Sequence, residues 1–141
     1  MSEQLPIVVT AGVVVRDGCI LVARRKPGSH LEGLWEFPGG KLEPNESPEV
    51  CLAREFKEEL GVEISVERIL EVVFHRYPEK NVLLLFYSCR LIHGEPRAQD
   101  VAEFAWVSRK ELPDLNWAPA DVVFVRKLAD ENNVFGFSTG N

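Results

Sequence analysis

Apolar residues and turn-forming residues alternate along the chain in a pattern typical of strands. Two β-rich runs, VTAGVVV and CILVA, flank Asp17-Gly18, a dipeptide that favours a tight hairpin turn. The runs EISVERILEVVFHRY and NVLLLFYSCRL predict two longer strands. The second of these is apolar on both faces, which favours a central place in a sheet. EFAWVS predicts one more short strand.

A helix in the middle of the chain is marked at both ends. Ser47 suits the N-cap, Pro48 suits the first helical position, and Gly61 suits the turn that ends a helix. These signals predict a helix from Pro48 to Leu60. Its apolar positions form one stripe, which must pack on the sheet. The stripe consists of Leu52, Ala53, Phe56 and Leu60.

The remaining segments complete the expected organisation. KPGSHLEG is rich in turn residues and predicts a loop, and Ser108 is expected to cap a brief turn. Pro119 is expected to open a final helix that ends at about Asp130, and the tail after it, residues 131–141, is expected to be loose. Strands come first and helices interleave, so the pattern predicts one α/β domain over residues 1–141 with a mixed β-sheet.

Composition narrows the classes of protein that fit. A chain of 141 residues with 45% hydrophobic content can bury one core but not two. A net charge of −6 argues against broad binding to a nucleic-acid backbone, which needs clustered basic residues. The scattered Cys19, Cys51 and Cys89 indicate reduced, buried thiols in a cytoplasmic protein. The N-terminal sequence predicts neither a signal peptide nor a membrane span.

The predicted helix carries a row of glutamates that raises a chemical question. Glu55, Glu58 and Glu59 stand at positions i, i+3 and i+4, so they share one side of the helix and repel one another. One interpretation is a solvated face laced by pairs such as Arg54 with Glu58. The other is a site for a hard cation such as Mg²⁺, which prefers oxygen ligands and completes its shell with water and substrate phosphates.

The wider sequence favours the cation site. From Gly40 the chain reads Gly-x5-Glu46-x7-Arg-Glu-Phe-Lys-Glu-Glu-Leu-Gly-Val, ending at Val62. This resembles the Nudix box, Gly-x5-Glu-x7-Arg-Glu-U-x-Glu-Glu-x-Gly-U with U a bulky apolar residue, at every fixed position. The preceding LWEFPGGK and the sequence from about Val8 to Leu128 are similar to the MutT-like branch of that family.

The resemblance implies an α/β/α sandwich that hydrolyses a nucleoside diphosphate linked to another group. It implies Mg²⁺, or Mn²⁺ as a substitute, lowering the pKa of a bound water. Arg54 would orient the carboxylates, and either Glu55 or Glu58 would accept the proton of the attacking water. The metal ligands implied by the family are Gly39 through its carbonyl, Glu55, Glu58, Glu59 and Glu103, although Glu103 could equally be an ordinary charge at a strand edge.

Substrate contacts are also implied by position in the family. Arg25 and His30 match phosphate- and sugar-contacting positions, and Lys80 falls where MutT has an arginine near the base. Phe37 could flank a base or belong to the core beside Trp35. The segment before the box adds further candidate substrate contacts: Glu36, Pro38, Gly39, Gly40 and Lys41.

Asp121 is the residue on which the choice of base depends. The pattern Ala-Pro-Ala-Asp resembles the segment of the CTP pyrophosphohydrolase and MutT-like group that reads the nucleobase, where MutT has asparagine. An ionised Asp121 only accepts hydrogen bonds and would suit the cytosine amino group, whereas a protonated one could also donate and suit an oxidised guanine. Alternatively, Asp121 simply favours the start of a helix.

These expectations converge on a nucleoside triphosphate pyrophosphohydrolase that acts on damaged or surplus nucleotides such as 8-oxo-dGTP or CTP. The partner implied is a small nucleotide, with no stable nucleic acid and no membrane, and the protein is expected to be a monomer or homodimer. The alternatives are another Nudix substrate, such as ADP-ribose, a dinucleoside polyphosphate or an RNA 5′ end, and a non-catalytic nucleotide-sensing module.

Overall fold

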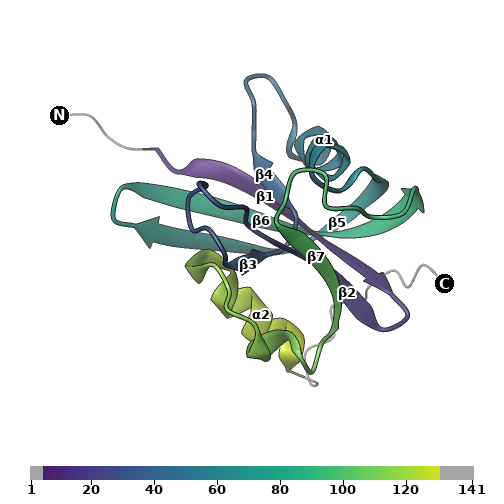
Figure 1. The fold of residues 1–141 in the computed structure, drawn as a ribbon. Helices are drawn as coiled ribbons and strands as arrows, with labels where there is room; N and C mark the ends of the chain where they lie inside the picture. The colour runs from purple at the N-terminus through teal and green to yellow at the C-terminus, as the bar shows by residue number, and fades with distance from the viewer. Residues whose placement is uncertain (1–4, 131–141) are drawn as a thin grey trace.

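A computed structural model describes residues 5–130; the tail expected to be loose, residues 131–141, lies outside this range. The order of elements alternates strands and helices as predicted (Figure 1). In sequence they are β1 (Ile7–Arg16), β2 (Cys19–Arg24), β3 (Trp35–Glu36), β4 (Gly39–Lys41), α1 (Pro48–Leu60), β5 (Glu63–Tyr77), β6 (Lys80–His93), β7 (Glu103–Ser108), two 3-10 turns η1 (Leu112–Asp114) and η2 (Pro119–Asp121), and α2 (Val122–Ala129).

The seven strands form one mixed sheet. Its main order is β3-β2-β1-β6-β5, while β4 pairs with β1 and β7 pairs with β2. The β1–β6 pair is parallel from Ile7 opposite Val82 to Val14 opposite Cys89, and the other pairs are antiparallel. The strand β6 lies between β1 and β5, which confirms the central place predicted from its apolar faces.

Helices α1 and α2 cover opposite faces of the sheet, which gives the predicted α/β/α sandwich (Figure 1). Consecutive residues of a strand point to opposite faces, so Val13 and Val14 of β1 belong to different cores. Val13 packs with Phe124 and Leu128 of α2, whereas Val14 packs with residues of α1.

The helix α1 has the predicted bounds because its end signals are satisfied locally. The Ser47 hydroxyl accepts a hydrogen bond from the Val50 amide at 3.2 Å. Gly61 takes a left-handed conformation (φ 68°) and its amide donates to the Lys57 carbonyl at 3.1 Å. Of the predicted stripe, three residues are fully buried and Ala53 is half-buried. A Cβ at Gly12 of β1 would lie 2.5 Å from the Phe56 ring, so the missing side chain lets the helix approach the strand.

Four details differ from the sequence predictions or were missed by them. The final helix begins as the 3-10 turn η2, and its α-helical part ends at Ala129. The short strands β3 and β4 were not predicted, because they are held by pairing with distant strands rather than by a local pattern. All three cysteines are free, but Cys19 is only half-buried.

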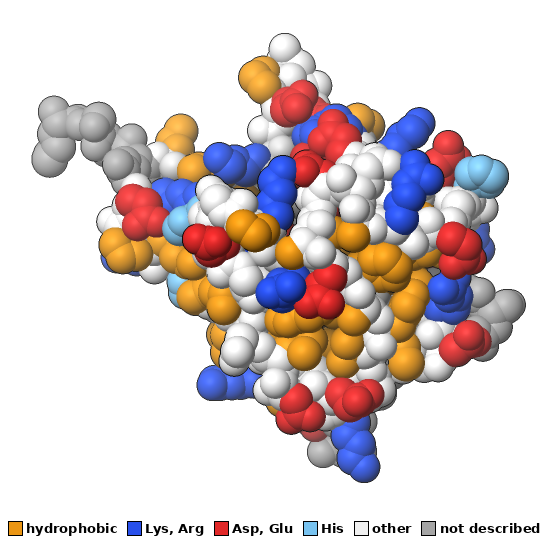
Figure 2. Space-filling view, in the orientation of Figure 1, with side chains coloured by type: hydrophobic (Ala, Val, Ile, Leu, Met, Phe, Trp, Pro, Cys, Tyr) orange, Lys and Arg blue, Asp and Glu red, His pale blue; other side chains and the backbone are white. Residues whose placement is uncertain are grey.

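Charged side chains of both signs are mixed on the face of the molecule that contains β7 and α2. On the face in Figure 2, basic side chains are interspersed with acidic ones rather than collected in a single patch. Among the described residues, no helix is long and apolar enough to cross a membrane.

Candidate active site

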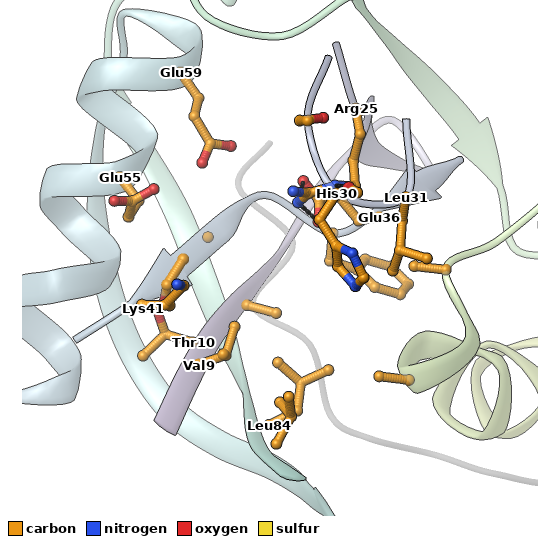
Figure 3. A pocket seen from close by; sticks show the side chains of 18 of the residues that line it. Val9, Thr10, Arg25, His30, Leu31, Glu36, Lys41, Glu55, Glu59 and Leu84 are labelled. Carbon is orange, nitrogen blue, oxygen red and sulfur yellow. Dashed lines mark hydrogen bonds and ion pairs between the residues drawn. The ribbon is translucent and has the colours of Figure 1, made fainter. Parts of the chain in front are cut away.

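A cavity of about 680 Å³ opens between α1, the short strand β4 and the tip of the β5–β6 hairpin. Glu55 and Glu59 enter it from α1, while Arg25, His30 and Leu31 lie across the cavity from them (Figure 3). We call the α1 side the carboxylate end. We call the opposite side, which also includes Tyr77 and Asp121, the distal end.

Arg54 organises the carboxylate end. Its guanidinium donates two hydrogen bonds to Glu46, at 2.7 and 2.9 Å, one to Glu55 at 2.7 Å and one to Glu58 at 3.2 Å. This contact lowers the pKa of Glu46 to about 2, because the hydrogen bonds stabilise its ionised form. These hydrogen bonds explain why the sequence motif contains both Arg54 and Glu46, although Glu46 lies outside the cavity.

Glu59 is the least satisfied group at the carboxylate end. Its Oε1 atom is buried and has no hydrogen-bond partner among the described residues. Burial is the largest cause that raises the pKa of Glu59, followed by the neighbouring carboxyl groups of Glu55 and Glu36. A hydrogen bond from the Gly39 backbone works in the opposite direction. A buried oxygen without a partner, beside other carboxyl groups, costs free energy that a cation would relieve.

This donor set fits a divalent cation in its chemistry. Carboxylate oxygens are the ligands that Mg²⁺ and Mn²⁺ prefer, and the orphaned Glu59 oxygen lies among them. Among residues 5–130, no three His, Cys, Asp or Glu side chains already converge on one metal position. Arg54 holds Glu55 and Glu58 in the structure, and Glu55 also lies against Glu59, so these carboxylates are already gathered on one side of the cavity.

The two glycines before α1 allow a close approach between backbone and carboxylate. A Cβ at Gly40 would lie 2.4 Å from the Glu55 Oε2 atom, and one at Gly39 would lie 2.0 Å from the Thr10 carbonyl oxygen. Thr10 pairs with Gly40 across β1 and β4, and its hydroxyl donates to the Gly40 carbonyl at 3.2 Å. Any larger residue would displace Glu55 or separate the two strands.

The distal end is built around an ion pair. The Arg25 guanidinium donates to Glu36 at 3.0 Å and also donates to the His30 carbonyl. Burial raises the pKa of Glu36, and Arg25 partly offsets that rise. The His30 ring meets the Tyr77 ring edge-on, with centroids 5.6 Å apart. The loop before β3 is therefore fastened to the distal end at both Arg25 and His30.

Asp121 is buried in the distal end. Only 5% of its surface is exposed, and it makes no capping hydrogen bond although it precedes α2. Asp121 therefore does not cap α2 through a side-chain hydrogen bond. Burial raises the pKa of Asp121 well above its usual range, and the charge of Glu36 adds to the rise while Arg25 opposes it.

The structure brings most of the predicted site residues to one cavity. Those that line it are Arg25, His30, Glu36, Phe37, Gly39, Gly40, Lys41, Arg54, Glu55, Glu58, Glu59, Lys80 and Asp121. Pro38 and Glu103 are not among the lining residues. Phe37 is also a core residue, stacked on Trp117 with ring centroids 4.9 Å apart.

Glu103 lies where strand pairing places it, opposite Arg24 on β2. Its carboxylate is 2.6 Å from the Arg24 guanidinium, and half of its side chain is exposed. The geometry therefore does not support the expected role of Glu103 as a metal ligand. Asp100, three residues earlier, does line the cavity, and its amide donates to the Glu59 carbonyl at 3.0 Å. Its carboxylate forms an ion pair with Lys26, and about half of the side chain is exposed.

Sequence reasoning also missed other residues that line the cavity. Thr10 and Leu84 come from the strands beneath it, and Tyr77 comes from the end of β5. The only sequence signal for Asp100 was an acidic residue shortly before a predicted strand, which is common in loops. Tyr77 carried no signal, because its contacts are with residues distant in the sequence.

Comparisons with known proteins agree with this geometry. A NUDIX domain model matches residues 6–128. The 8-oxo-dGTP diphosphatase of Proteus vulgaris is 39% identical over 62% of this chain and 79% of its own length. The CTP pyrophosphohydrolase of Escherichia coli K12 is 37% identical over 82% of this chain and 86% of its own length. The structure of the MutT Nudix hydrolase from Burkholderia pseudomallei has a TM-score of 0.76 and 30% identity, covering 87% of this chain and 98% of that one. The chain belongs to the Nudix family and is a Nudix hydrolase.

Proposed function

We propose that this protein hydrolyses nucleoside triphosphates to a nucleoside monophosphate and pyrophosphate, and that an 8-oxoguanine nucleotide is its preferred substrate. The observation that carries the proposal is the pairing of two acids in one cavity, the half-buried Glu59 with its unpartnered Oε1 atom at the carboxylate end and the buried Asp121 at the distal end. The first suits cation-assisted chemistry on phosphates, and the second suits recognition of a base. Relatives that act on 8-oxo-dGTP and on CTP support the same class of reaction.

Nudix hydrolases generally need a divalent metal, and we propose Mg²⁺, with Mn²⁺ as a substitute. When bound, the cation would neutralise the polyphosphate and lower the pKa of a bound water. Its ligands would be the carboxylates of α1, the Gly39 carbonyl and, in place of Glu103, Asp100. Asp100 lines the cavity beside the Glu59 backbone, and its carboxylate would exchange its ion pair with Lys26 for the cation. The ligands from α1 are Glu55, Glu58 and Glu59.

The chain's own residues position the reactants. Arg54 orients Glu55 and Glu58 by direct hydrogen bonds, and one of these two carboxylates accepts the proton of the attacking water. The water oxygen bonds to phosphorus, the anhydride P–O bond breaks, and its electrons leave with pyrophosphate or the nucleotide, according to which phosphorus is attacked. The positive charge of Lys41, which lies on the α1 side of the cavity, would hold phosphate oxygens. Arg25 at the distal end would contact the sugar side of the nucleotide, and Lys80, which pairs with Tyr77, would lie near the base.

The base preference follows from the state of Asp121. A raised pKa favours the protonated carboxyl, which both donates and accepts a hydrogen bond, as an asparagine does. The major-groove edge of guanine offers two acceptors, N7 and O6, whereas oxidation at C8 turns N7 into an N–H donor. A protonated Asp121 therefore matches the donor–acceptor pair of 8-oxoguanine better than the two acceptors of guanine.

A cytosine nucleotide is the second candidate. An ionised Asp121 would accept a hydrogen bond from the cytosine amino group, and the named activity of the Escherichia coli relative favours this substrate. Arg25 promotes that ionised state by lowering the pKa of Asp121, against the larger effects of burial and Glu36. The two candidates thus differ in one proton on one residue.

We place this activity in the cytoplasm, because the three cysteines are free and none is paired in a disulfide. We propose a monomer or homodimer that binds no nucleic acid stably, since the net charge is −6 and the face in Figure 2 shows no continuous basic patch. RNA 5′ ends are accordingly less suited to the cavity than free nucleotides.

A hydrolysis screen tests the proposal directly. The purified chain is incubated with Mg²⁺ and ordinary or 8-oxo nucleoside triphosphates, and with CTP, ADP-ribose and a dinucleoside polyphosphate. We expect monophosphate and pyrophosphate, with ¹⁸O from solvent water in one of them and the highest kcat/KM for 8-oxo-dGTP. Tight nucleotide binding without product over hours would instead identify a nucleotide sensor, and preferred cleavage of ADP-ribose would reassign the substrate.

A further inference from the structure

Tyr77 joins three segments that surround the distal end of the cavity. It is the last residue of β5 and pairs with Lys80 across the hairpin tip. Its ring meets the ring of His30, which belongs to the loop before β3. Its hydroxyl oxygen accepts a hydrogen bond from the Ala120 amide at 3.2 Å, and Ala120 directly precedes Asp121.

The hydroxyl of Tyr77 still has a proton to donate. Among residues 5–130, no acceptor for that proton lies within hydrogen-bonding distance, although the residue lines the cavity. Burial raises the pKa of Tyr77, so the hydroxyl keeps its proton at neutral pH. A phenol that accepts from the backbone and lines a cavity is ready to donate to a ligand.

The group that accepts the Tyr77 proton can be inferred from where the phosphates and the base of a nucleotide would lie in the cavity. Phosphate groups belong at the carboxylate end, where the cation ligands gather, so the distal end receives the base. Asp121 is buried without a capping hydrogen bond, and the Tyr77–Ala120 bond fixes the turn that carries it. A tyrosine donor beside an acid matches a base that presents a carbonyl oxygen next to an N–H group.

We propose that Tyr77 determines base specificity: its hydroxyl donates to a carbonyl oxygen of the purine and holds the Asp121 turn through the Ala120 amide. This assignment rests on the proposed function and adds to it a residue that no local sequence pattern indicated. Removing the hydroxyl takes away a donor that only a base with a correctly placed carbonyl can use. The loss should therefore depend on the base and not on the triphosphate.

Tyr77→Phe tests this, with Tyr87→Phe as the matched control. Tyr87 is the only other tyrosine of the chain; it is buried under α1 and does not line the cavity. The substrates are 8-oxo-dGTP, dGTP, which lacks the C8 carbonyl, and 8-oxo-dATP, which lacks the C6 carbonyl. In Tyr77→Phe we expect at least one ratio of kcat/KM, 8-oxo-dGTP over either analogue, to fall about tenfold or more. Tyr87→Phe should keep both ratios.

A measurement without turnover separates recognition from catalysis. Calorimetric binding of 8-oxo-dGMP in the absence of metal should weaken about tenfold in Tyr77→Phe and stay unchanged in Tyr87→Phe. Unchanged ratios and unchanged 8-oxo-dGMP binding in Tyr77→Phe would overturn the assignment. Failure of the wild type to hydrolyse any triphosphate would contradict the proposed function itself, and the binding comparison would still decide the role of Tyr77.

Discussion

Each end of the cavity contains an acid withdrawn from solvent, the half-buried Glu59 at one end and the buried Asp121 at the other, but the surroundings of the two acids differ. Glu59 has Glu55 beside it, in a row of carboxylates that Arg54 organises. Asp121 lies among apolar residues such as Ala118 and Ala120. A carboxyl group surrounded by others is prepared for a cation, whereas a solitary buried carboxyl group is prepared to stay neutral and form hydrogen bonds.

The charge of Glu36 affects the acids at both ends of the cavity. Its charge is among the causes that raise the pKa of Glu59 and also among those that raise the pKa of Asp121. Its partner Arg25 lowers the pKa of Asp121. The negative charge of Glu36 therefore acts on both acids. Removing either acid should change the stability of the protein in the same direction, whereas the effects on activity should differ.

The largest expected effect comes from Glu59→Gln at the carboxylate end. Losing one cation ligand should lower kcat/KM by about 100- to 10,000-fold for every base, since the metal contributes several kcal/mol to transition-state stabilisation. Steady-state kinetics on 8-oxo-dGTP and CTP measure this. Glu63→Gln, the same change at an exposed glutamate, is the control. Near-normal turnover of Glu59→Gln at saturating Mg²⁺ would contradict the metal site.

The same variant should be more stable than the wild type without metal. Because the pKa of Glu59 is raised in the folded state, its stabilising contribution is full below about 4.5, its unfolded value, and is lost as pH rises through the folded value. The melting temperature of Glu59→Gln in EDTA should therefore exceed that of the wild type increasingly from pH 4 to pH 8. Each kcal/mol corresponds to about 2–4 °C. Added Mg²⁺ should stabilise the wild type more than the variant.

Asp100→Asn should have the next largest effect on activity, and it tests whether Asp100 or Glu103 belongs to the carboxylate end. If Asp100 completes the cation site, kcat/KM should fall about 10- to 100-fold and the Mn²⁺ dissociation constant should rise by a similar factor. Glu103→Gln breaks only the pair with Arg24 and should change either quantity less than about twofold, as expected for a half-exposed ion pair. The reverse order of the two variants would restore Glu103 as the ligand.

Asp121→Asn should give the smallest loss of activity and the clearest change in base choice. Asparagine reproduces the donor and acceptor of a protonated aspartate, so 8-oxo-dGTP hydrolysis should persist while the ratio of 8-oxo-dGTP to CTP rises about tenfold. Equal losses for all bases would mean that Asp121 serves only the fold. An unchanged ratio would remove it from base recognition.

The pH dependence of this variant distinguishes the two states of Asp121. The raised pKa means that the stability contributed by protonated Asp121 is full below about 3.8 and is lost as pH rises through the folded value. Asp121→Asn should therefore melt at a higher temperature than the wild type, and increasingly so toward alkaline pH. In the wild type, preference for 8-oxo-dGTP over CTP should decline over the same pH range.

The sequence predicted what short-range signals control. Asp17-Gly18 determines the β1–β2 hairpin, and Ser47 and Gly61 determine both ends of α1, because each acts within a few residues of its own position. The carboxylate end was predicted for the same reason: its glutamates lie within one turn of one helix. Arg54 could also be predicted, since its i+4 partner Glu58 is on the same helix.

The parts that were missed depend on contacts between distant segments. Glu103 was expected either at the metal or as an ordinary charge at a strand edge, and the pairing of β7 with β2 that places it opposite Arg24 could not be read from its own segment. Tyr77 and Asp100 reach the cavity only through the hairpin tip and the loop beside the end of α1. No local sequence pattern shows that Tyr77 and Asp100 line the cavity. A resemblance to a family can show this only for residues that are the same in the aligned sequences.

The parallel pairing of β1 with β6 has a consequence for how the protein folds. The box helix is local and can form within one stretch of chain, but the cavity also needs Thr10 and Leu84 from these two strands. The segment between them, which includes α1 and all of β5, must close into a loop before they pair, and such long-range pairing is slow. A chain emerging from the ribosome can thus display the full row of glutamates well before it has any cavity in which a nucleotide could meet them.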